Sequence, residues 1–295
     1  MSGRKPTFAL NYNSAFGGVD PGTLVTVARQ AEQCGFEAFY TPEHVAMYQG
    51  AKLGDWPIPT DLPYLDPLDV LTFVAAHTEH LLLGTAVLLL PYHHPVTLAK
   101  RLATIDVLSG GRMRLFTVGV GALPGEAAAV GVDYSTRGRR TDEAIEVLRR
   151  LWAEDEAGAT FHGEFYDLDN VFSYPKPLTA SGPASAFPIH VGGSSKAAAR
   201  RAGRIGDGWF GGGSMSDDER RALWDLVRST AVEAGRDPDA ISYTRWGHLE
   251  MSVEQVEKLT EQGVTRIVVG APAGEPDEQR AQLVDFAQRF DLGKG

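Results

Sequence analysis

The sequence lacks several features that particular classes of protein need. Among its 295 residues there is one cysteine, Cys34, so no disulfide can form within the chain, and we expect a reducing, cytoplasmic location. The N-terminal segment has too short an apolar run for a signal peptide. The apolar run over residues 81–90 is too short to cross a bilayer, so we expect no membrane partner.

Metal-binding motifs and an excess of positive charge are missing as well. The chain has no HExxH motif and no cysteine pair, and the adjacent His93 and His94 would not face one another on a strand, so we predict no metal site. The net charge of −10 argues against a nucleic-acid partner. The cluster of Arg137, Arg139 and Arg140 is interpreted as the solvated start of a helix.

Residues 81–121 contain one complete β–α–β unit. The buried-looking strand at 81–90 is ended by Pro91 and Pro95, and a helical pattern follows. That helix ends at Gly110-Gly111, a typical C-terminal stop. A second strand at 112–118 leads to Gly119 and Gly121, which leave the backbone free of side chains at the strand's end. The unit therefore predicts a ligand-binding edge after its second strand.

The same alternation runs along the whole chain. We expect strands at residues 7–12, 36–42, 81–90, 112–118, 188–191, 208–210, 241–246 and 264–269. We expect helices at residues 21–34, 67–80, 96–109, 137–154, 216–234 and 276–290, with two more starting near 194 and at 252. This order predicts an α/β fold, a parallel (β/α)8 TIM barrel forming a single domain over residues 1–295, with a doubly wound open sheet as the alternative. Residues 155–187 lack a clear period and are expected to form an insertion over the C-terminal mouth.

The barrel rule places the active site at the C-terminal ends of the strands. His44 follows the second strand, beside a long loop over 43–66, and an imidazole there can exchange a proton near neutral pH. Its alternative role is that of a surface or structural histidine. Gly192, Gly193 and Ser194 lie between the fifth strand and a helix, where backbone N–H groups bind phosphate well. A plain tight turn is the alternative for these three residues.

Five segments together resemble the luciferase-like flavin and deazaflavin oxidoreductases over nearly the whole chain. Within that family the chain is most similar to the subgroup that uses coenzyme F420, a deazaflavin. The closer similarity lies in PEH at 42–44, LPYHHP at 90–95 and LSGGRMRL at 108–115. The five segments are GFEAFYTPEH, residues 66–121, RGRRTDEAIEVLRRLW, FHGEFYDL and PIHVGGSSKAAARRAGRIGDGWF.

The resemblance implies where the cofactor lies. It implies a barrel with the ring at the strand C-termini and a cis peptide bond between Ala86 and Val87 behind that ring. By the same resemblance Glu43 contacts the deazaflavin and His44 is the active-site histidine. Val120-Gly121 and Gly192-Gly193 match backbone segments near the ring and the phosphate. A homodimer is also implied.

The resemblance predicts an F420-dependent oxidoreductase that moves a hydride between the deazaflavin and a small organic substrate, with His44 supplying a proton. An FMN-dependent monooxygenase using reduced flavin and oxygen is the alternative, and a non-catalytic flavin-binding protein is a second one. Sugar-phosphate dehydrogenases of the family carry a glutamate after GxG where this chain has Ala122, so their reaction is not transferred. Aromatic residues on the two long loops indicate a partly apolar substrate, although aromatics as often serve packing: Tyr48, Trp56, Tyr64, Phe161 and Phe172.

Overall fold

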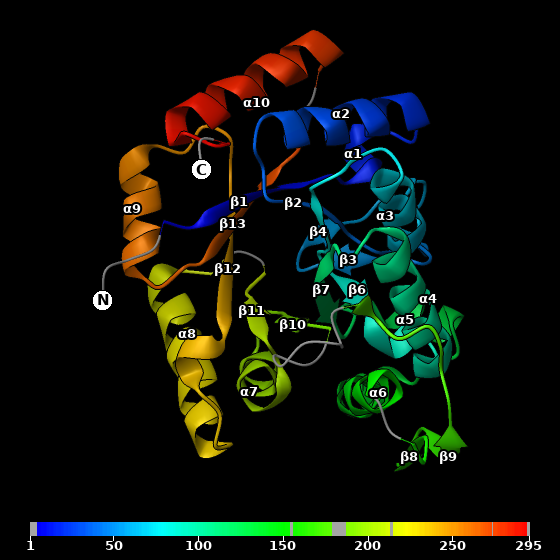
Figure 1. The fold of residues 1–295 in the computed structure, drawn as a ribbon. Helices are drawn as coiled ribbons and strands as arrows, with labels where there is room; N and C mark the ends of the chain where they lie inside the picture. The colour runs from blue at the N-terminus through cyan, green and yellow to red at the C-terminus, as the bar shows by residue number, and fades with distance from the viewer. Residues whose placement is uncertain (1–4, 154–155, 179–186, 213–214, 273, 294–295) are drawn as a thin grey trace.

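The computed structural model describes residues 5–153, 156–178, 187–212, 215–272 and 274–293. Eight strands of its nine-stranded main sheet are parallel and close into a ring, because β13 pairs with β1 and β10 pairs with β7 (Figure 1). The closed ring confirms the predicted TIM barrel and excludes the open sheet. The ring strands are β1 Thr7–Asn11, β2 Ala38–Thr41, β5 Leu82–Thr85, β7 Met113–Gly119, β10 Ile189–Gly192, β11 Gly208–Phe210, β12 Ser242–Gly247 and β13 Arg266–Gly270.

Eight helices surround the strands as the alternation predicted (Figure 1). Their starts follow local capping chemistry: the Asp20 side chain accepts the Thr23 N–H at 2.7 Å, and Ser252 and Gln255 form the expected capping box. These helices are α2 Pro21–Gln33, α3 Pro67–Ala75, α4 Pro95–Leu108, α6 Arg137–Trp152, α7 Lys196–Ile205, α8 Asp217–Glu233, α9 Val253–Glu261 and α10 Pro276–Phe290. Two short helices were not predicted, α1 Ser14–Gly17 and α5 Pro124–Ala129.

The barrel has an inner and an outer apolar core. Strand side chains alternate between the two, which is why the strands read as almost continuous apolar runs. The outer core lies between strands and helices, and α2 contributes Leu24, Val27 and Ala28 to it. The inner core is a separate cluster formed by Ala9, Ala38, Tyr40, Leu115, Phe210 and Val268.

The apolar run at 81–90 is not one strand. It forms β5 and, after an interruption, β6 Leu88–Leu89, and both pair with β7. The interruption is the Ala86-Val87 peptide bond, which is cis as the resemblance implied. The prediction located the strand residues correctly but was wrong in giving one continuous strand. Hydropathy alone does not distinguish a straight strand from an interrupted one.

Helix α3 ends at Ala75, five residues before the predicted end. The guanidinium of Arg112 donates hydrogen bonds to backbone carbonyl groups at and just beyond the end of this helix, to Ala75 O at 2.7 Å and to Thr78 O at 3.1 Å. An arginine just before β7 thus supplies the donors that another helical turn would have supplied.

The expected insertion does not cover the mouth in its described part. It forms a hairpin of β8 Ala159–His162 and β9 Asp167–Val171, which contacts α6. In Figure 1 the helix α6 lies between this hairpin and the barrel strands. The Glu143 carboxylate on α6 accepts the N–H groups of Glu164 and Phe165 at 2.8 and 2.9 Å, which fixes the hairpin turn to the helix. Residue 155 and residues 179–186 of this segment lie outside the described residues.

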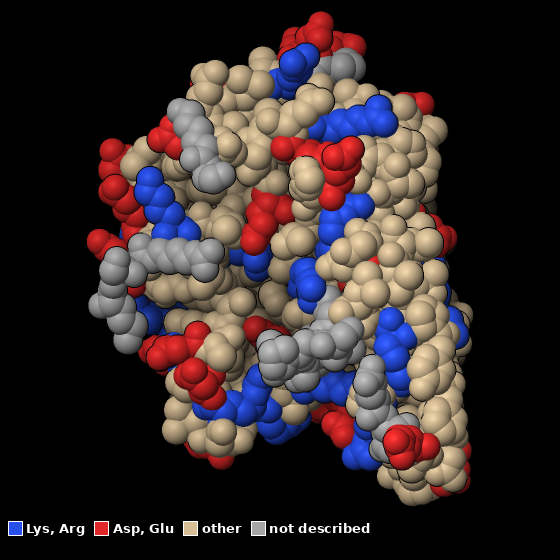
Figure 2. Space-filling model, in the orientation of Figure 1, with Lys and Arg blue, Asp and Glu red and all other residues tan. Residues whose placement is uncertain are grey.

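Figure 2 shows one face on which acidic and basic side chains are interspersed. None of the described helices has the length and apolar character needed to cross a membrane.

Candidate active site

The predicted site residues come together at one edge of the barrel. Glu43 and His44 follow β2, Ala86 and Val87 follow β5, Val120 and Gly121 follow β7, and the Gly193-Ser194 turn follows β10. Because β2, β5, β7 and β10 are parallel and adjacent, their C-terminal ends lie on the same rim. The barrel rule therefore placed these residues on one rim.

The loop after β5 is packed against two glycines. A Cβ on Gly119 would lie 2.5 Å from Val87 Cγ2, and a Cβ on Gly192 would lie 2.5 Å from Val87 Cγ1. The backbone of the loop is held to β2, since Ala86 N–H donates to Thr41 O at 3.0 Å and Glu43 N–H donates to Val87 O at 3.2 Å. The glycines at the ends of β7 and β10 thus leave room for the Val87 side chain below the mouth.

Glu43 bonds to this same loop. Its side chain is buried, and its carboxylate accepts the Leu89 N–H at 2.5 Å and contacts His93 Nε2 at 2.8 Å. Glu43 therefore joins the PEH and LPYHHP motifs within the chain. Its expected contact with a cofactor stays a prediction. Within the chain, its hydrogen bonds to Leu89 and His93 hold the segment after the cis peptide bond in place.

His44 faces a second buried carboxylate, that of Glu126. Its Nδ1 lies 3.3 and 3.2 Å from the two carboxylate oxygens, and Glu126 Oε1 also accepts the Val45 N–H at 2.7 Å. The Glu126 side chain has no exposed surface, whereas 26% of the His44 side chain is exposed. Tyr64 packs edge-on against the imidazole with ring centroids 4.7 Å apart.

Tyr92 lies under the loop that follows β7. A Cβ on Gly121 would be 2.2 Å from its hydroxyl oxygen, so this position has no room for a side chain, and its φ of +80° also favours glycine. The hydroxyl is buried without a hydrogen-bond partner among the described residues. Burial, with the Glu126 carboxylate as the next cause, raises the pKa of Tyr92 to about 12, so the phenol stays protonated at neutral pH.

The turn after β10 is partly occupied by its own contacts. Gly193 N–H donates to Phe210 O at 3.1 Å, and the Ser194 hydroxyl donates to Gly212 O. Ser195 caps α7 by accepting the Ala198 N–H at 3.1 Å, so the helix starts at Lys196, two residues after the expected position. The N–H groups of Lys196 and Ala197 in its first turn have no intrahelical partner. An anion would therefore meet this helix just beyond Ser194.

Two of the five aromatic residues expected at the substrate pocket lie near His44. Tyr64 contacts the imidazole, and the Tyr48 ring covers Gly125 at the start of α5. Phe161 is on the hairpin beside α6, where Arg150 lies 5.7 Å from its ring. The other two, Trp56 and Phe172, are exposed. The expectation that the insertion lines the pocket is thus not met by its described residues.

The arginine cluster separates into different roles. Arg137 Nε donates to Gly121 O at 3.2 Å, and its guanidinium lies 3.5 Å from the ring centroid of Tyr134. Arg139 pairs with Glu164 of the hairpin turn. Arg137 therefore supports the loop after β7, and the interpretation as a solvated helix start was wrong for this residue.

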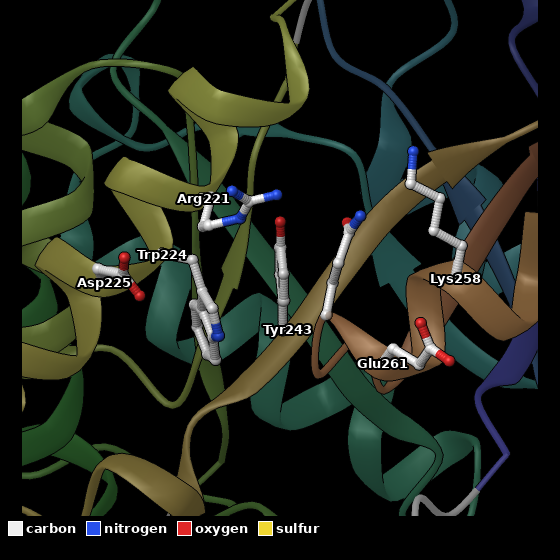
Figure 3. Close-up of a pocket in the computed structure, with 7 residues that line it drawn as sticks. Arg221, Trp224, Asp225, Tyr243, Lys258 and Glu261 are labelled. Atoms are coloured by element: carbon white, nitrogen blue, oxygen red, sulfur yellow. The ribbon is translucent and has the colours of Figure 1, made fainter.

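A cavity of about 430 Å³ lies elsewhere, between α8 and α9 (Figure 3). One of its lining residues is Tyr243, whose ring stacks on Trp224 with centroids 4.4 Å apart in the outer core. The lining residues are Arg221, Trp224, Asp225, Tyr243, Lys258, Glu261 and Gln262. It contains none of the residues that gather at the strand ends, so we place the candidate site at the rim. Within the described residues, no group of three or more His, Cys, Asp or Glu could hold a metal ion.

Sequence reasoning missed Glu126 and the pairing of Glu43 with His93. The available signal was weak, because an acidic residue in the first turn of a helix is usually a surface residue that favours the helix dipole. Pro124 at the first position of α5 marks a helix start, which could have directed attention to Glu126 two residues later. Nothing local indicated that its carboxylate reaches His44, 82 residues away in the chain.

Comparison with known proteins identifies relatives for the whole barrel. A family model described as "Luciferase-like monooxygenase" matches residues 7–289. An uncharacterized Mycobacterium tuberculosis protein is 32% identical over 255 residues, covering 83% of this chain and 84% of its own. The F420-dependent glucose-6-phosphate dehydrogenase of Kineococcus radiotolerans is 30% identical over 240 residues, covering 80% and 66%.

Another relative is a monooxygenase by name, and a solved structure of lower identity shares the fold. The 4-hydroxyprotoasukamycin monooxygenase of Streptomyces nodosus subsp. asukaensis is 30% identical over 232 residues, covering 75% of this chain and 58% of its own. The structure of an F420-dependent secondary alcohol dehydrogenase in complex with an F420-acetone adduct superposes with a TM-score of 0.77 at 17% identity. The superposition covers 99% of this chain and 100% of that one. At that identity the superposition supports the barrel fold and carries no statement about reaction.

Proposed function

Because the chain belongs to the luciferase-like monooxygenase family, we propose that it is an oxidoreductase dependent on coenzyme F420, acting on a small organic substrate at the rim formed by β2, β5, β7 and β10. Members of this family include F420-dependent enzymes and monooxygenases, both represented among the relatives at 30% identity. The preference for F420 rests on PEH, LPYHHP and LSGGRMRL. Two of these motifs are joined by the contact of 2.8 Å between Glu43 and His93.

The residues at the rim fit a flat ring system with a phosphate tail. Val87, seated on Gly119 and Gly192, and the backbone of Val120 and Gly121 would support the ring from below. The start of α7, just after Ser194, would receive the phosphate through backbone N–H groups.

A bound deazaflavin would accept or donate a hydride at its ring. The chain's own part is to position the substrate and to balance charge with a proton. His44 suits that task, because its ring is partly exposed at the rim and its Nδ1 is held by Glu126. Its Nε2 makes no hydrogen bond with any described residue, so this nitrogen is available to a substrate oxygen.

The observation that carries the proposal is the location of His44 on the same rim as the Val87 loop and its two glycines. Titration of purified protein with F420 and with FMN, followed by fluorescence, tests it. We expect F420 to bind at least tenfold more tightly. Tighter binding of FMN would transfer the proposal to the alternative, a monooxygenase using reduced flavin and oxygen, and oxygen consumption with reduced FMN would then be measured.

A non-catalytic flavin-binding protein is the second alternative. A histidine with a fully buried carboxylate partner is not needed to hold a ring, so the pair formed by His44 and Glu126 favours an enzyme. Turnover with any substrate that depends on His44 separates the two. Binding of cofactor without such turnover across alcohols, aldehydes and activated alkenes would favour the binding protein.

The same proposal includes a homodimer, as the resemblance implies, and a location in the cytoplasm, as the single cysteine indicates. Light scattering of the purified chain measures the assembly directly. We expect twice the chain mass of 31.9 kDa. A mass equal to one chain would contradict the dimer and would leave the site proposal as it stands, because every site residue named here belongs to one chain.

A further inference from the structure

The contact between Glu126 and His44 bears on which ring nitrogen of the histidine carries the hydrogen. We propose that Glu126 is a positioning residue that fixes the hydrogen of His44 on Nδ1 and thereby makes Nε2 the atom that takes and gives the proton at the rim. This inference rests on the proposed function for the statement that His44 moves a proton. It does not depend on which flavin is bound.

The burial of Glu126 sets the constraint. Its side chain has no exposed surface, so its carboxylate must find donors inside the protein. One donor is the Val45 N–H at 2.7 Å, and the next polar atom is His44 Nδ1 at 3.2 Å from Oε2. If Nδ1 carried a lone pair, it would face a carboxylate oxygen that also carries lone pairs. An ionised Glu126 therefore requires a hydrogen on Nδ1.

The neutral imidazole has one ring hydrogen, so a hydrogen on Nδ1 leaves the lone pair on Nε2. The partial exposure of His44 allows a ligand to reach the ring, while Glu126 stays behind it. When Nε2 accepts a proton from a substrate hydroxyl, the ring becomes an imidazolium with hydrogens on both nitrogens. The adjacent carboxylate then stabilises that positive charge, and no proton passes to Glu126.

The neighbouring pair has the opposite arrangement. Glu43 meets its histidine at Nε2, at 2.8 Å from His93, so the nitrogen that carries the hydrogen differs between the two pairs. This contrast provides a matched control inside the same chain. A change at Glu43 should alter the ring of His93 and leave that of His44 as it is, and a change at Glu126 should do the reverse.

The test is a long-range ¹H–¹⁵N correlation spectrum of the full-length protein with labelled histidine, at a pH where the rings are neutral. We expect His44 to show a protonated Nδ1 and an unprotonated Nε2. In Glu126→Gln the side-chain oxygen can still accept the Val45 N–H, and its NH₂ group then donates to Nδ1. The hydrogen of His44 should therefore move to Nε2, while Glu43→Gln leaves His44 unchanged.

The wild-type spectrum decides the proposal even if the variant fails to fold: a neutral His44 carrying its hydrogen on Nε2 would overturn it. So would a folded Glu126→Gln protein with an unchanged tautomer. Once a substrate is known, we expect Glu126→Gln to lower kcat at least tenfold with a smaller effect on KM. Failure of the protein to bind F420 would count against the proposed function, and the spectrum would still report on Glu126.

Discussion

The Val87 side chain occupies the space that a side chain on Gly192 would need. The distance from Val87 Cγ1 to the position of a Gly192 Cβ is 2.5 Å, well inside van der Waals contact, and Gly119 faces the other methyl group at the same distance. Three residues from three neighbouring strand ends thus form one packed unit. The glycine of the GGS motif that sequence reasoning assigned to phosphate binding also has this packing role.

The first prediction concerns that unit. Gly192→Ala should lower the free energy of unfolding by about 1–3 kcal/mol, the usual cost of overpacking. Adding Val87→Ala removes the two opposing methyl groups and should restore part of the loss, which urea denaturation of both single variants and the double variant would measure. Gly212→Ala is the matched control, because the nearest atom among the described residues, apart from its chain neighbours, would lie 3.9 Å from its Cβ. Equal costs for Gly192→Ala with and without Val87 would contradict the contact.

The second prediction concerns His44. His44→Ala should keep cofactor affinity within a few-fold and lose roughly two to four powers of ten in turnover, because a positioned acid or base contributes about that much. His162→Ala is a suitable control, since this exposed histidine pairs with Asp167 on the hairpin outside the barrel. Unchanged turnover would leave the proton to water, because the Tyr12 hydroxyl is bonded to the carbonyl of Gly17 at 2.7 Å and Glu43 is engaged by Leu89 and His93.

The third prediction tests the phosphate position. Ser194→Asp places a negative charge at an exposed position just before α7, and we expect cofactor binding to weaken about fivefold or more through repulsion. Ser229→Asp, on exposed surface of α8, is the control for the added charge. Gly193→Val is less informative, because Gly193 has a φ of +125° and a valine there would be strained. Equal affinity in Ser194→Asp and wild type would place the phosphate elsewhere.

The fourth prediction concerns pH and the barrel interior. His190 is buried on β10, and burial, followed by the charge of Arg266, lowers its pKa from 6.5 to about 3. The unfolded chain therefore binds a proton that the folded chain does not bind between these two values. This group therefore does not lower the free energy of unfolding above pH 6.5. As the pH falls from 6.5 toward 3, it lowers that free energy by about 1.4 kcal/mol per pH unit.

His190→Gln removes that titration and should give a shallower fall in stability between pH 6.5 and pH 4.5. Urea denaturation of both proteins across this interval measures the difference in slope. Other groups titrate in both proteins alike, so the difference reports His190. Parallel curves for the variant and the wild type would show that the imidazole is charged inside the barrel.

Local patterns in the sequence were sufficient for the architecture. Alternating strand and helix signals predicted the closed parallel barrel, and capping residues such as Asp20 and Ser252 marked helix starts that the structure confirms. The parallel arrangement then placed the loops after β2, β5, β7 and β10 on one rim without further information. These features follow from the sequence because each depends on periodicity and caps within a few residues.

Only the tertiary structure decided which side chains meet on that rim. Glu126 reaches His44, Glu43 turns inward to Leu89 and His93, and the hairpin of β8 and β9 lies beside α6. None of these pairings has a periodic signal. The partners of Glu43 and Glu126 lie 46 to 82 residues away in the chain and are brought to them by the packing of whole strands and helices. The residue types at the site were readable from the sequence, while their partners, and so the atom on His44 that can carry the proton, depend on that packing.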